Sequence, residues 1–188
     1  MLETLRLKKG KYILLSAHRE ENIDNADNFM ALMNAVNAMA ENYNMPIIYS
    51  THPRSKKIIE DRGFKFHPNV RSLKPFGFAD YNNLQLNAFC VVSDSGTLPE
   101  EASYFKLPAV SIRTSTERPE AIDKGNFTIG NITTEQVLQA VDMEVKMNKN
   151  NDLGINVPNY VDENVSTKVV KLIQSYTGIV NKMVWRKL

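Results

Sequence analysis

The sequence has a single cysteine and no long apolar run, and both absences narrow the class of protein. Cys90 is the only cysteine among 188 residues, so no disulfide can form within the chain, and its apolar neighbours predict a buried, reduced thiol. No apolar run approaches the ~18 residues that a membrane-spanning helix needs. The first residues also lack the apolar segment of a signal peptide. We therefore expect a cytoplasmic protein with no membrane partner.

Net charge is also nearly absent. The 23 basic and 21 acidic residues leave a formal charge of +2, so no general field attracts nucleic acid or an anionic membrane. Any anionic ligand must be held by a local site. The three histidines lack the close spacing of zinc ligands, and no Asp-rich calcium loop is present. The residues therefore predict neither a metal nor another cofactor.

The composition is that of a globular domain, with 43% apolar and 23% charged residues. Short apolar runs at 12–17, 46–50, 89–93 and 108–112 are typical of strands buried on both faces of a parallel sheet. Between and after them, helical patterns are expected from Asp27 to Tyr43, over 54–62, over 80–87, from about Thr97, over 133–147 and over 164–177. This alternation predicts an α/β fold, a three-layer Rossmann-like sandwich around a doubly wound parallel sheet.

The two ends of the chain have a different character. Residues 1–11 resemble a helix tail and a basic turn, and we expect them to be a linker between two domains. The polar stretch 148–160, which contains Gly154 and Pro158, predicts a loop. Beyond it, about 161–188, we expect a helix with one apolar stripe that packs elsewhere than on the sheet.

In open parallel sheets, ligands bind beyond the carboxyl ends of the strands. Three unusual segments follow predicted strands there. They are "HREEN" at 18–22, "DSGTLPEE" at 94–101 and "RTSTERPE" at 113–120.

The segment 94–101 carries the signature of a helix start. Thr97 and Glu100 have the spacing of a capping box. Ser95 and Gly96 would then lie at the amino end of the helix, where free amides let a phosphate approach closely. The carboxylate of Glu101 could accept from the two vicinal hydroxyls of a ribose beyond those phosphates. The alternative is an ordinary capped helix whose two glutamates offset its dipole.

The segment 113–120 brings a second helix start and two guanidinium groups. Pro119 is typical of a first helical turn, and Arg113 and Arg118 flank a run of hydroxyls. An arginine in this place can neutralise a diphosphate through bidentate hydrogen bonds. The alternative is an arginine paired with Glu117 or Glu120 on a solvated face.

His18 follows the first predicted strand directly, where it could donate to a bridging oxygen or act as an acid or base. His52 and His67 precede prolines in turns, so we interpret both as structural. In the segment 74–83, Tyr81 or Phe78 could offer a face to a base. Core packing is the alternative for either ring.

The motifs "SAHREEN", "SDSGTLPEEAS" and "IRTSTERPEA" occur in that order. With them the chain, from about residue 12 to about residue 176, resembles the carboxyl-terminal half of the non-hydrolysing UDP-N-acetylglucosamine 2-epimerase family. Proteins of that family have two Rossmann-like domains in the glycosyltransferase-B arrangement, with UDP held mainly by the second. The resemblance therefore implies a single UDP-binding domain over 1–188, a UDP-sugar substrate, a missing amino-terminal domain, and a homodimer.

The resemblance also implies a set of site residues. The diphosphate would contact the Ser95–Thr97 turn, the ribose Glu101, and the uracil residues 76–81, while His18 and Arg118 would reach the phosphates and the leaving oxygen. The catalytic candidates are His18, Arg118 and Glu117, and the substrate-binding candidates are Arg19, Asn22, Phe76, Tyr81, Ser95, Gly96, Thr97, Glu101 and Arg113.

Two departures from the family pattern bear on the substrate. Many members carry a second arginine where this chain has Glu20, and a second glycine where it has Thr97. Both variants look like the branch that makes UDP-N-acetyl-L-fucosamine for capsule or O-antigen. A glycosyltransferase of the same architecture, a hydrolysing epimerase and a non-catalytic nucleotide-binding module remain alternatives. The resemblance further implies elimination and re-addition of UDP, with the proton-transfer carboxylates in the missing domain, so we expect the chain to be inactive alone.

Overall fold

A computed structural model describes residues 1–187 of the chain. The described residues form two units. The first runs from Met1 to Val157 and contains the whole sheet, and the second begins at Pro158.

The first unit is built on one parallel sheet of six strands in the order β3-β2-β1-β4-β5-β6. The strands are β1 (Ile13–Ser16), β2 (Ile47–Ser50), β3 (Val70–Leu73), β4 (Cys90–Ser93), β5 (Ala109–Ser111) and β6 (Thr128–Ile129). The chain starts at the centre of the sheet, runs outward to β3, returns to β4 beside β1 and then runs outward to β6. This is the doubly wound topology that the apolar runs predicted.

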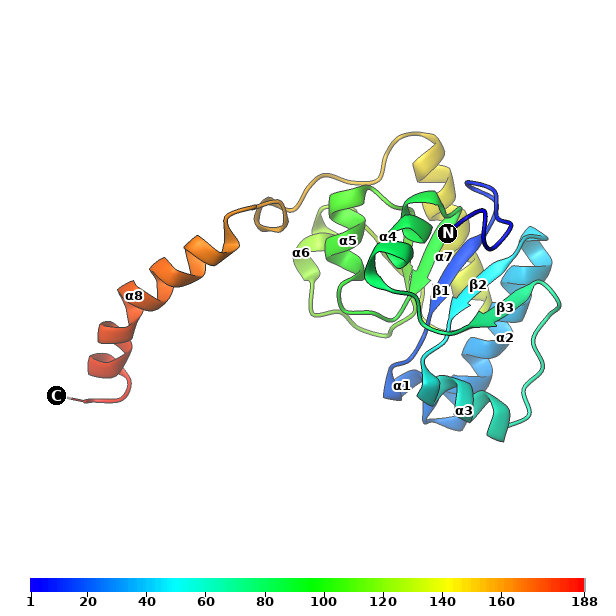
Figure 1. Ribbon diagram of the computed structural model, residues 1–188, viewed down its shortest axis with the longest axis horizontal. Coiled ribbons are helices and arrows are strands. Elements are labelled where there is room, and N and C mark those ends of the chain that lie inside the picture. The colour runs from blue at the N-terminus through cyan, green and yellow to red at the C-terminus, as the bar shows by residue number, and fades with distance from the viewer. Residues whose placement is uncertain (188) are drawn as a thin grey trace. The chain divides into compact units, whose positions relative to one another are not determined.

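Helices connect and cover these strands (Figure 1). The helices of the first unit are α1 (Glu20–Ile23), α2 (Ala26–Tyr43), α3 (Pro53–Asp61), α4 (Phe78–Asn87), α5 (Leu98–Phe105), α6 (Pro119–Asp123) and α7 (Thr134–Lys149). α2 and α7 pack side by side on one face of the sheet, and α4 and α5 lie over the other (Figure 1). The three-layer prediction is therefore confirmed.

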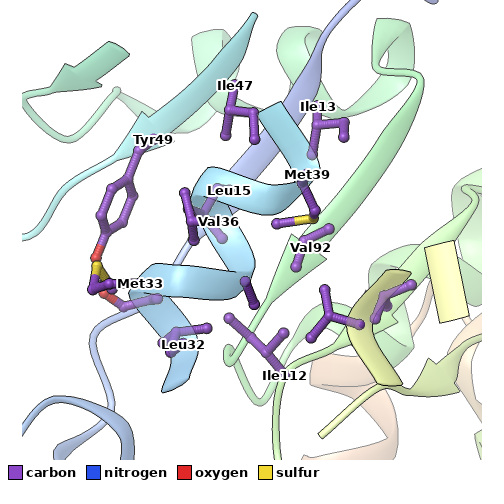
Figure 2. Packing of buried hydrophobic residues seen from close by; sticks show 14 of the residues in the cluster. Ile13, Leu15, Leu32, Met33, Val36, Met39, Ile47, Tyr49, Val92 and Ile112 are labelled. Atoms are coloured by element: carbon purple, nitrogen blue, oxygen red, sulfur yellow. The ribbon is translucent and has the colours of Figure 1, made fainter. Parts of the chain in front are cut away.

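The core shows why the strand sequences are continuously apolar. Ile13 and Leu15 of β1 point into the larger cluster under α2 and α7, whereas Leu14 points to the opposite face and packs with Leu84 of α4. Successive side chains of a strand alternate between its two faces, so a strand covered by helices on both faces must be apolar throughout. Figure 2 shows the larger cluster, with Val36 and Met39 of α2 beside the side chains of the central strands.

Helix α2 begins at a different cap from the one expected. Asn25, not Asp27, is the capping residue, and its side-chain oxygen accepts hydrogen bonds from the backbone amides of Asp27 and Asn28 at 2.9 and 3.0 Å. Both Asn and Asp are good capping residues, and the sequence pattern alone does not separate two of them placed two positions apart. The helix ends at Asn44, which adopts a left-handed conformation.

Strands β3 and β6 were not among the predicted apolar runs. They are the two edge strands, and their residues are only partly buried or exposed. Each is covered less completely than the central strands, so neither shows the continuous apolar run of a fully buried strand.

Residues 1–11, expected to be a linker, belong to the first unit and pack against its core. Leu7 is buried with Tyr12 and Leu14, and Leu2 and Leu5 pack against the same cluster. In the second unit, α8 (Val165–Met183) follows a short 3-10 turn, and its apolar side chains are exposed. None of the helices described between residues 1 and 187 is long and apolar enough to cross a membrane.

Candidate functional site

The candidate site lies where the strand order reverses, between β1 and β4. The chain leaves β1 toward β2 on one side and leaves β4 toward β5 on the other, so the connections diverge at the carboxyl ends of the strands, which is where ligands bind in open α/β sheets. The segments 18–22, 94–101 and 113–120 follow β1, β4 and β5 at this edge. The three segments singled out in the sequence therefore come together.

The centre of this edge is Asp94, which sequence reasoning did not name as a site residue. Its side chain is fully buried, and its carboxylate accepts hydrogen bonds from the backbone amides of His18 and Arg19 at 2.9 Å each. Nδ2 of Asn22 donates to the same carboxylate at 3.2 Å and to the carbonyl oxygen of Ile112 at 3.0 Å. Asp94 thus ties the loop after β1 to the ends of β4 and β5.

His18 lies against this carboxylate and also faces solvent. Its Nδ1 atom is 3.3 Å from Oδ1 of Asp94, and its side chain is 44% exposed. A carboxylate at this distance favours the tautomer with the proton on Nδ1, which leaves Nε2 available to a ligand. The ring lies 6.1 Å from that of His52, and both line a pocket of about 550 Å³ together with Arg19 and Arg54.

The two other histidines serve the local structure, as predicted. Nδ1 of His52 accepts from the backbone amide of Arg54 at 3.2 Å and caps α3. Nδ1 of His67 accepts from the backbone amide of Asn69 at 3.1 Å. His52 nevertheless stands close enough to His18 to line the same pocket.

The turn after β4 places small and hydroxyl side chains at the start of α5. The backbone amide of Thr97 donates to Oγ of Ser95 at 3.3 Å, and the two hydroxyl oxygens are 3.0 Å apart. A Cβ atom on Gly96 would lie 3.2 Å from Nη2 of Arg19. The guanidinium of Arg19 therefore packs against the backbone of Gly96. It lies at the position where a phosphate was expected to approach.

The expected capping box is wrong. The Thr97 side chain makes no capping hydrogen bond, because its hydroxyl donates to Oε1 of Glu101 at 2.9 Å. Oε2 of Glu101 accepts from Nε2 of Gln85 at 2.6 Å. Glu100 turns instead toward α6, where Oε1 accepts from Nε of Arg118 at 2.6 Å.

The contact between Glu100 and Arg118 joins the starts of α5 and α6. Arg118 also donates from Nη1 to the carbonyl oxygen of Glu117 at 3.2 Å, and its side chain is partly exposed. The α6 helix begins at Pro119, as the sequence indicated. Arg118 therefore lies at the same edge of the sheet as the turn after β4, and its Nε–H group is already paired with the carboxylate of Glu100.

Arg113 has a different environment. It is only 4% exposed, and its two terminal nitrogens donate to the two carboxylate oxygens of Glu117 at 2.7 Å each. Nε lies 3.4 Å from Oε1 of Glu21. The bidentate pair with Glu117 is the alternative that the sequence left open.

The same pair determines the ionisation of Glu117. Hydrogen bonding from Arg113 lowers the pKa of the Glu117 carboxyl to about 2. A carboxylate of such low basicity is a weak proton acceptor. We therefore regard Glu117 as a group that holds Arg113 and lies 3.9 Å from Nη1 of Arg19, rather than as a general base.

The aromatic residues near α4 separate into two groups. Phe78 is 87% exposed, whereas Phe76 and Tyr81 pack against the cluster on the α4 face of the sheet. Burial raises the pKa of the Tyr81 hydroxyl, and the neighbouring charge of Glu101 raises it further. Tyr81 is therefore a partly buried neighbour of Glu101.

Another hollow, of about 670 Å³, lies between α6, α7 and the loop before Val157. It is lined in part by Glu144, whose Oε1 accepts from Thr128 at 2.5 Å and whose pKa is raised by burial. None of the predicted site residues lines it. Among the residues that the structure describes, no cluster of three or more His, Cys, Asp or Glu could hold a metal ion.

Comparison with known proteins gives a result that agrees with this geometry. Residues 1–174 match the family model for UDP-N-acetylglucosamine 2-epimerase. The chain belongs to this family. It is 34% identical over 153 residues to the UDP-N-acetylglucosamine 2-epimerase of Methanococcus maripaludis, covering 78% of this chain and 42% of the relative.

Solved 2-epimerases share the fold. The UDP-N-acetylglucosamine 2-epimerase of Rickettsia bellii aligns with 99% of this chain and 50% of its own, at a TM-score of 0.83 and 38% identity. The enzyme of Methanocaldococcus jannaschii, solved in complex with UDP-GlcNAc and UDP, aligns with 87% of this chain and 45% of its own, at a TM-score of 0.77 and 27% identity. The chain spans about half the length of these relatives. The expected Rossmann-like half of the glycosyltransferase-B type is confirmed.

Proposed function

We propose that this chain is the UDP-binding half of a non-hydrolysing UDP-N-acetyl-hexosamine 2-epimerase. The observation that carries the proposal is the meeting of three segments at the β1/β4 switch point. His18, Arg19 and Arg118 bring imidazole and guanidinium groups to the turn Ser95–Thr97 at the start of α5. Such a site suits a diphosphate, since cations and the amino end of a helix would act together there.

The roles of individual residues follow from their places at this edge. The diphosphate would lie against Ser95, Gly96 and Thr97, at the amino end of α5. Arg19 and Arg118 lie near this turn and would neutralise the charge of the diphosphate. The carboxylate of Glu101 lies one helical turn further on and would accept from the ribose hydroxyls.

Four further candidates are proposed to have narrower roles in the same site. Asn22 and Arg113 are buried, so they would hold the shape of this edge of the sheet rather than carry most of the ligand contact. Phe76 is close to the start of α4, where its backbone would meet the edge of the uracil. Tyr81 would support the same turn from the protein side.

The chemistry explains why such a pocket serves an epimerase. The C2 hydrogen of an amino sugar is not adjacent to a carbonyl, so simple deprotonation is costly. Elimination of UDP leaves a 2-acetamidoglycal, and re-addition of UDP with protonation of the other face of C2 inverts that carbon. The negative charge that develops on the departing diphosphate would be stabilised by preoriented amides and cations. His18 would donate from Nε2 to the leaving oxygen when its ring carries a proton on both nitrogens.

Neither Glu117 nor Glu101 suits proton transfer at C2. Glu117 is a weak base because of its pair with Arg113, and Glu101 is held by two donors of the protein. We therefore propose that the proton-transfer groups belong to an amino-terminal domain and that this chain is inactive alone. Turnover of UDP-N-acetylglucosamine by the isolated chain would contradict this.

The exposed stripe of α8 supports the same two-domain arrangement. Its apolar residues lie three or four positions apart over several turns, namely Val165, Val169, Leu172, Ile173, Tyr176, Ile179 and Val180. We propose that this stripe packs on the amino-terminal domain, within an enzyme that works in the cytoplasm as a homodimer.

The substrate branch is proposed from Glu20 and Thr97. The carboxylate of Glu20 accepts from Nη1 of Arg54 at 2.6 Å, and Asp24 accepts from Nη2 of the same arginine at 2.6 Å. A pocket with this acid in place of a second arginine is less cationic. The two variant positions support a 6-deoxy sugar, with UDP-N-acetyl-L-fucosamine as the product for capsule or O-antigen synthesis.

Calorimetric titration with UDP tests the nucleotide site directly. We expect the wild type to bind UDP, and both Arg118→Ala and Glu101→Ala to weaken binding by about tenfold or more, since each removes charge-assisted hydrogen bonds. Arg71→Ala is the matched control, because Arg71 lies on the edge strand β3 and donates to the carbonyl oxygen of Leu5 at 2.8 Å. Equal affinity for UDP in all four proteins would contradict the assignment of this site.

A further inference from the structure

Gln85 is a buried polar residue that sequence reasoning did not single out. It lies on α4 and is 1% exposed. Its Nε2 atom donates to Oε2 of Glu101 on α5 at 2.6 Å, a short hydrogen bond to a charged acceptor. The contact joins two helices that flank β4, 16 residues apart in the sequence.

The orientation of the Gln85 amide follows from its partner. An ionised carboxylate only accepts hydrogen bonds, so the NH2 group must face Glu101 and the carbonyl oxygen must point away. That oxygen, Oε1, is buried and has no hydrogen-bond partner among the residues the structure describes. An unpaired buried acceptor destabilises the fold. A purely structural glutamine would be expected to have both ends paired.

Thr97 holds the other side of the same carboxylate. Its hydroxyl donates to Oε1 of Glu101 at 2.9 Å. A carboxylate has about four acceptor positions, two on each oxygen. One donor on each oxygen leaves one position free on each, and the half-buried Glu101 still reaches solvent. Two free positions on neighbouring oxygens match two hydroxyls on neighbouring carbons.

We propose that Gln85 is a positioning residue that, with Thr97, fixes the Glu101 carboxylate to accept both vicinal hydroxyls of a ribose. The pocket then selects ribonucleoside diphosphates against 2′-deoxyribonucleoside diphosphates. This inference rests on the proposed binding of UDP. It adds that Gln85 contributes to selectivity for ribose through Glu101, without touching the nucleotide itself.

The selectivity has a simple physical origin. A 2′-deoxy nucleotide fills only one of the two free positions, so one oxygen of a fixed, partly buried carboxylate keeps only its protein donor and lacks the second one. Losing a hydrogen bond to a charged group of this kind corresponds to a preference of about tenfold or more. A carboxylate that can rotate relieves the loss by turning to water, and the preference then falls.

The test compares UDP with 2′-deoxy-UDP by calorimetric titration of the full chain. The wild type is expected to prefer UDP by about tenfold, and Gln85→Met to reduce the preference to about twofold, because methionine fills a similar volume but donates no hydrogen bond. Gln139→Met is the matched control. Gln139 also donates to a glutamate, Glu135, at 3.3 Å, but on the exposed face of α7.

A ratio of affinities distinguishes positioning from a structural role. If Gln85 only joined two helices, its substitution would weaken UDP and 2′-deoxy-UDP equally and leave the preference unchanged, which would overturn the inference. Thr97→Val provides a second test should Gln85→Met fail to fold, since it removes the other donor to Glu101 at an exposed position. An unchanged preference for UDP in Thr97→Val would also contradict the inference.

The failure of the inference is separable from that of the proposed function. A wild type that binds UDP and 2′-deoxy-UDP equally would overturn the inference and leave the UDP site standing. A wild type that binds neither nucleotide would overturn both. Loss of the preference in Gln85→Met and in Thr97→Val, with Gln139→Met unchanged, would support the assignment.

Discussion

The backbone amide of His18 donates to both carboxylate oxygens of Asp94, at 3.1 and 2.9 Å, across 76 residues of sequence. The imidazole Nδ1 atom of His18 lies 3.3 Å from the same carboxylate. A single buried acid therefore sets both the backbone and the ring of the residue that we place at the leaving oxygen.

This relationship predicts a large loss of stability in Asp94→Asn. The amide side chain keeps one acceptor oxygen but turns an NH2 group toward backbone donors, so buried N–H groups lose their partners. We expect the free energy of unfolding to fall by about 3 kcal/mol. Urea unfolding followed by circular dichroism measures it.

Asp142→Asn is the matched control for that change. Asp142 accepts a hydrogen bond from Tyr43 at 2.6 Å, but at an exposed position. Its substitution should change the free energy of unfolding by less than about 1 kcal/mol. A loss no larger in Asp94→Asn than in this control would contradict the central place of Asp94.

A methyl group on Gly96 should affect binding more than folding. The Cβ atom of Gly96→Ala would lie 3.2 Å from Nη2 of Arg19, the mobile end of a long side chain, so the fold can accommodate it by moving the guanidinium. We expect thermal stability near that of the wild type and an affinity for UDP about tenfold lower. Thermal denaturation and calorimetry provide the two measurements.

Gly178→Ala is the companion variant, because Gly178 lies on α8 and a Cβ atom there would meet nothing within 4 Å. It should leave both stability and the affinity for UDP close to those of the wild type. Equal binding by Gly96→Ala and Gly178→Ala would show that the approach of Arg19 to Gly96 does not matter for the ligand.

The pair between Arg113 and Glu117 predicts a dependence of stability on pH. Arg113 lowers the pKa of Glu117 from 4.5 to about 2. A carboxyl whose folded pKa is depressed contributes stability above its unfolded pKa, and this contribution is lost as the pH falls through the folded value. The wild type should therefore exceed Glu117→Gln in stability above pH 4.5, and the difference should shrink between pH 4.5 and pH 2.

Thermal midpoints recorded from pH 6 downward in steps test this prediction. Glu41→Gln, which removes an exposed carboxylate from α2, is the control for a general effect of charge. A difference between wild type and Glu117→Gln that stays constant across the acidic range would contradict the assigned pair.

The thiol of Cys90 should be unreactive in the folded protein. Its thiol is fully buried in β4, and burial raises its pKa well above the usual value, so little thiolate forms at neutral pH. We expect no reaction with an aromatic disulfide reagent until the protein is unfolded in urea. Rapid labelling of the native protein at the rate of an exposed thiol would show that the strand is not packed as described.

Much of the scaffold could be predicted from local patterns. The runs 12–17 and 89–93 became β1 and β4 because a strand covered on both faces must be apolar throughout. Glu101 and Arg118 could be assigned to one edge of the sheet because both follow strands whose carboxyl ends lie there. The edge strands β3 and β6 lack that signal and were missed.

The partners of the polar side chains could not be predicted in the same way. Glu100 pairs with Arg118 rather than with the cap of its own helix, and Arg113 is held by Glu117. Asp94 carried one sequence signal, its position directly after a buried strand, whereas Gln85 carried none.

The sequence by itself determined the layers of this protein and the edge at which a ligand would meet it, because hydrophobic period and turn chemistry act over a few residues. Only the tertiary structure decided which donor meets which acceptor. Asp94 meets His18 and Gln85 meets Glu101 through the packing of elements far apart in the chain. Such contacts depend on the register and crossing of whole helices and strands, and no local pattern encodes them.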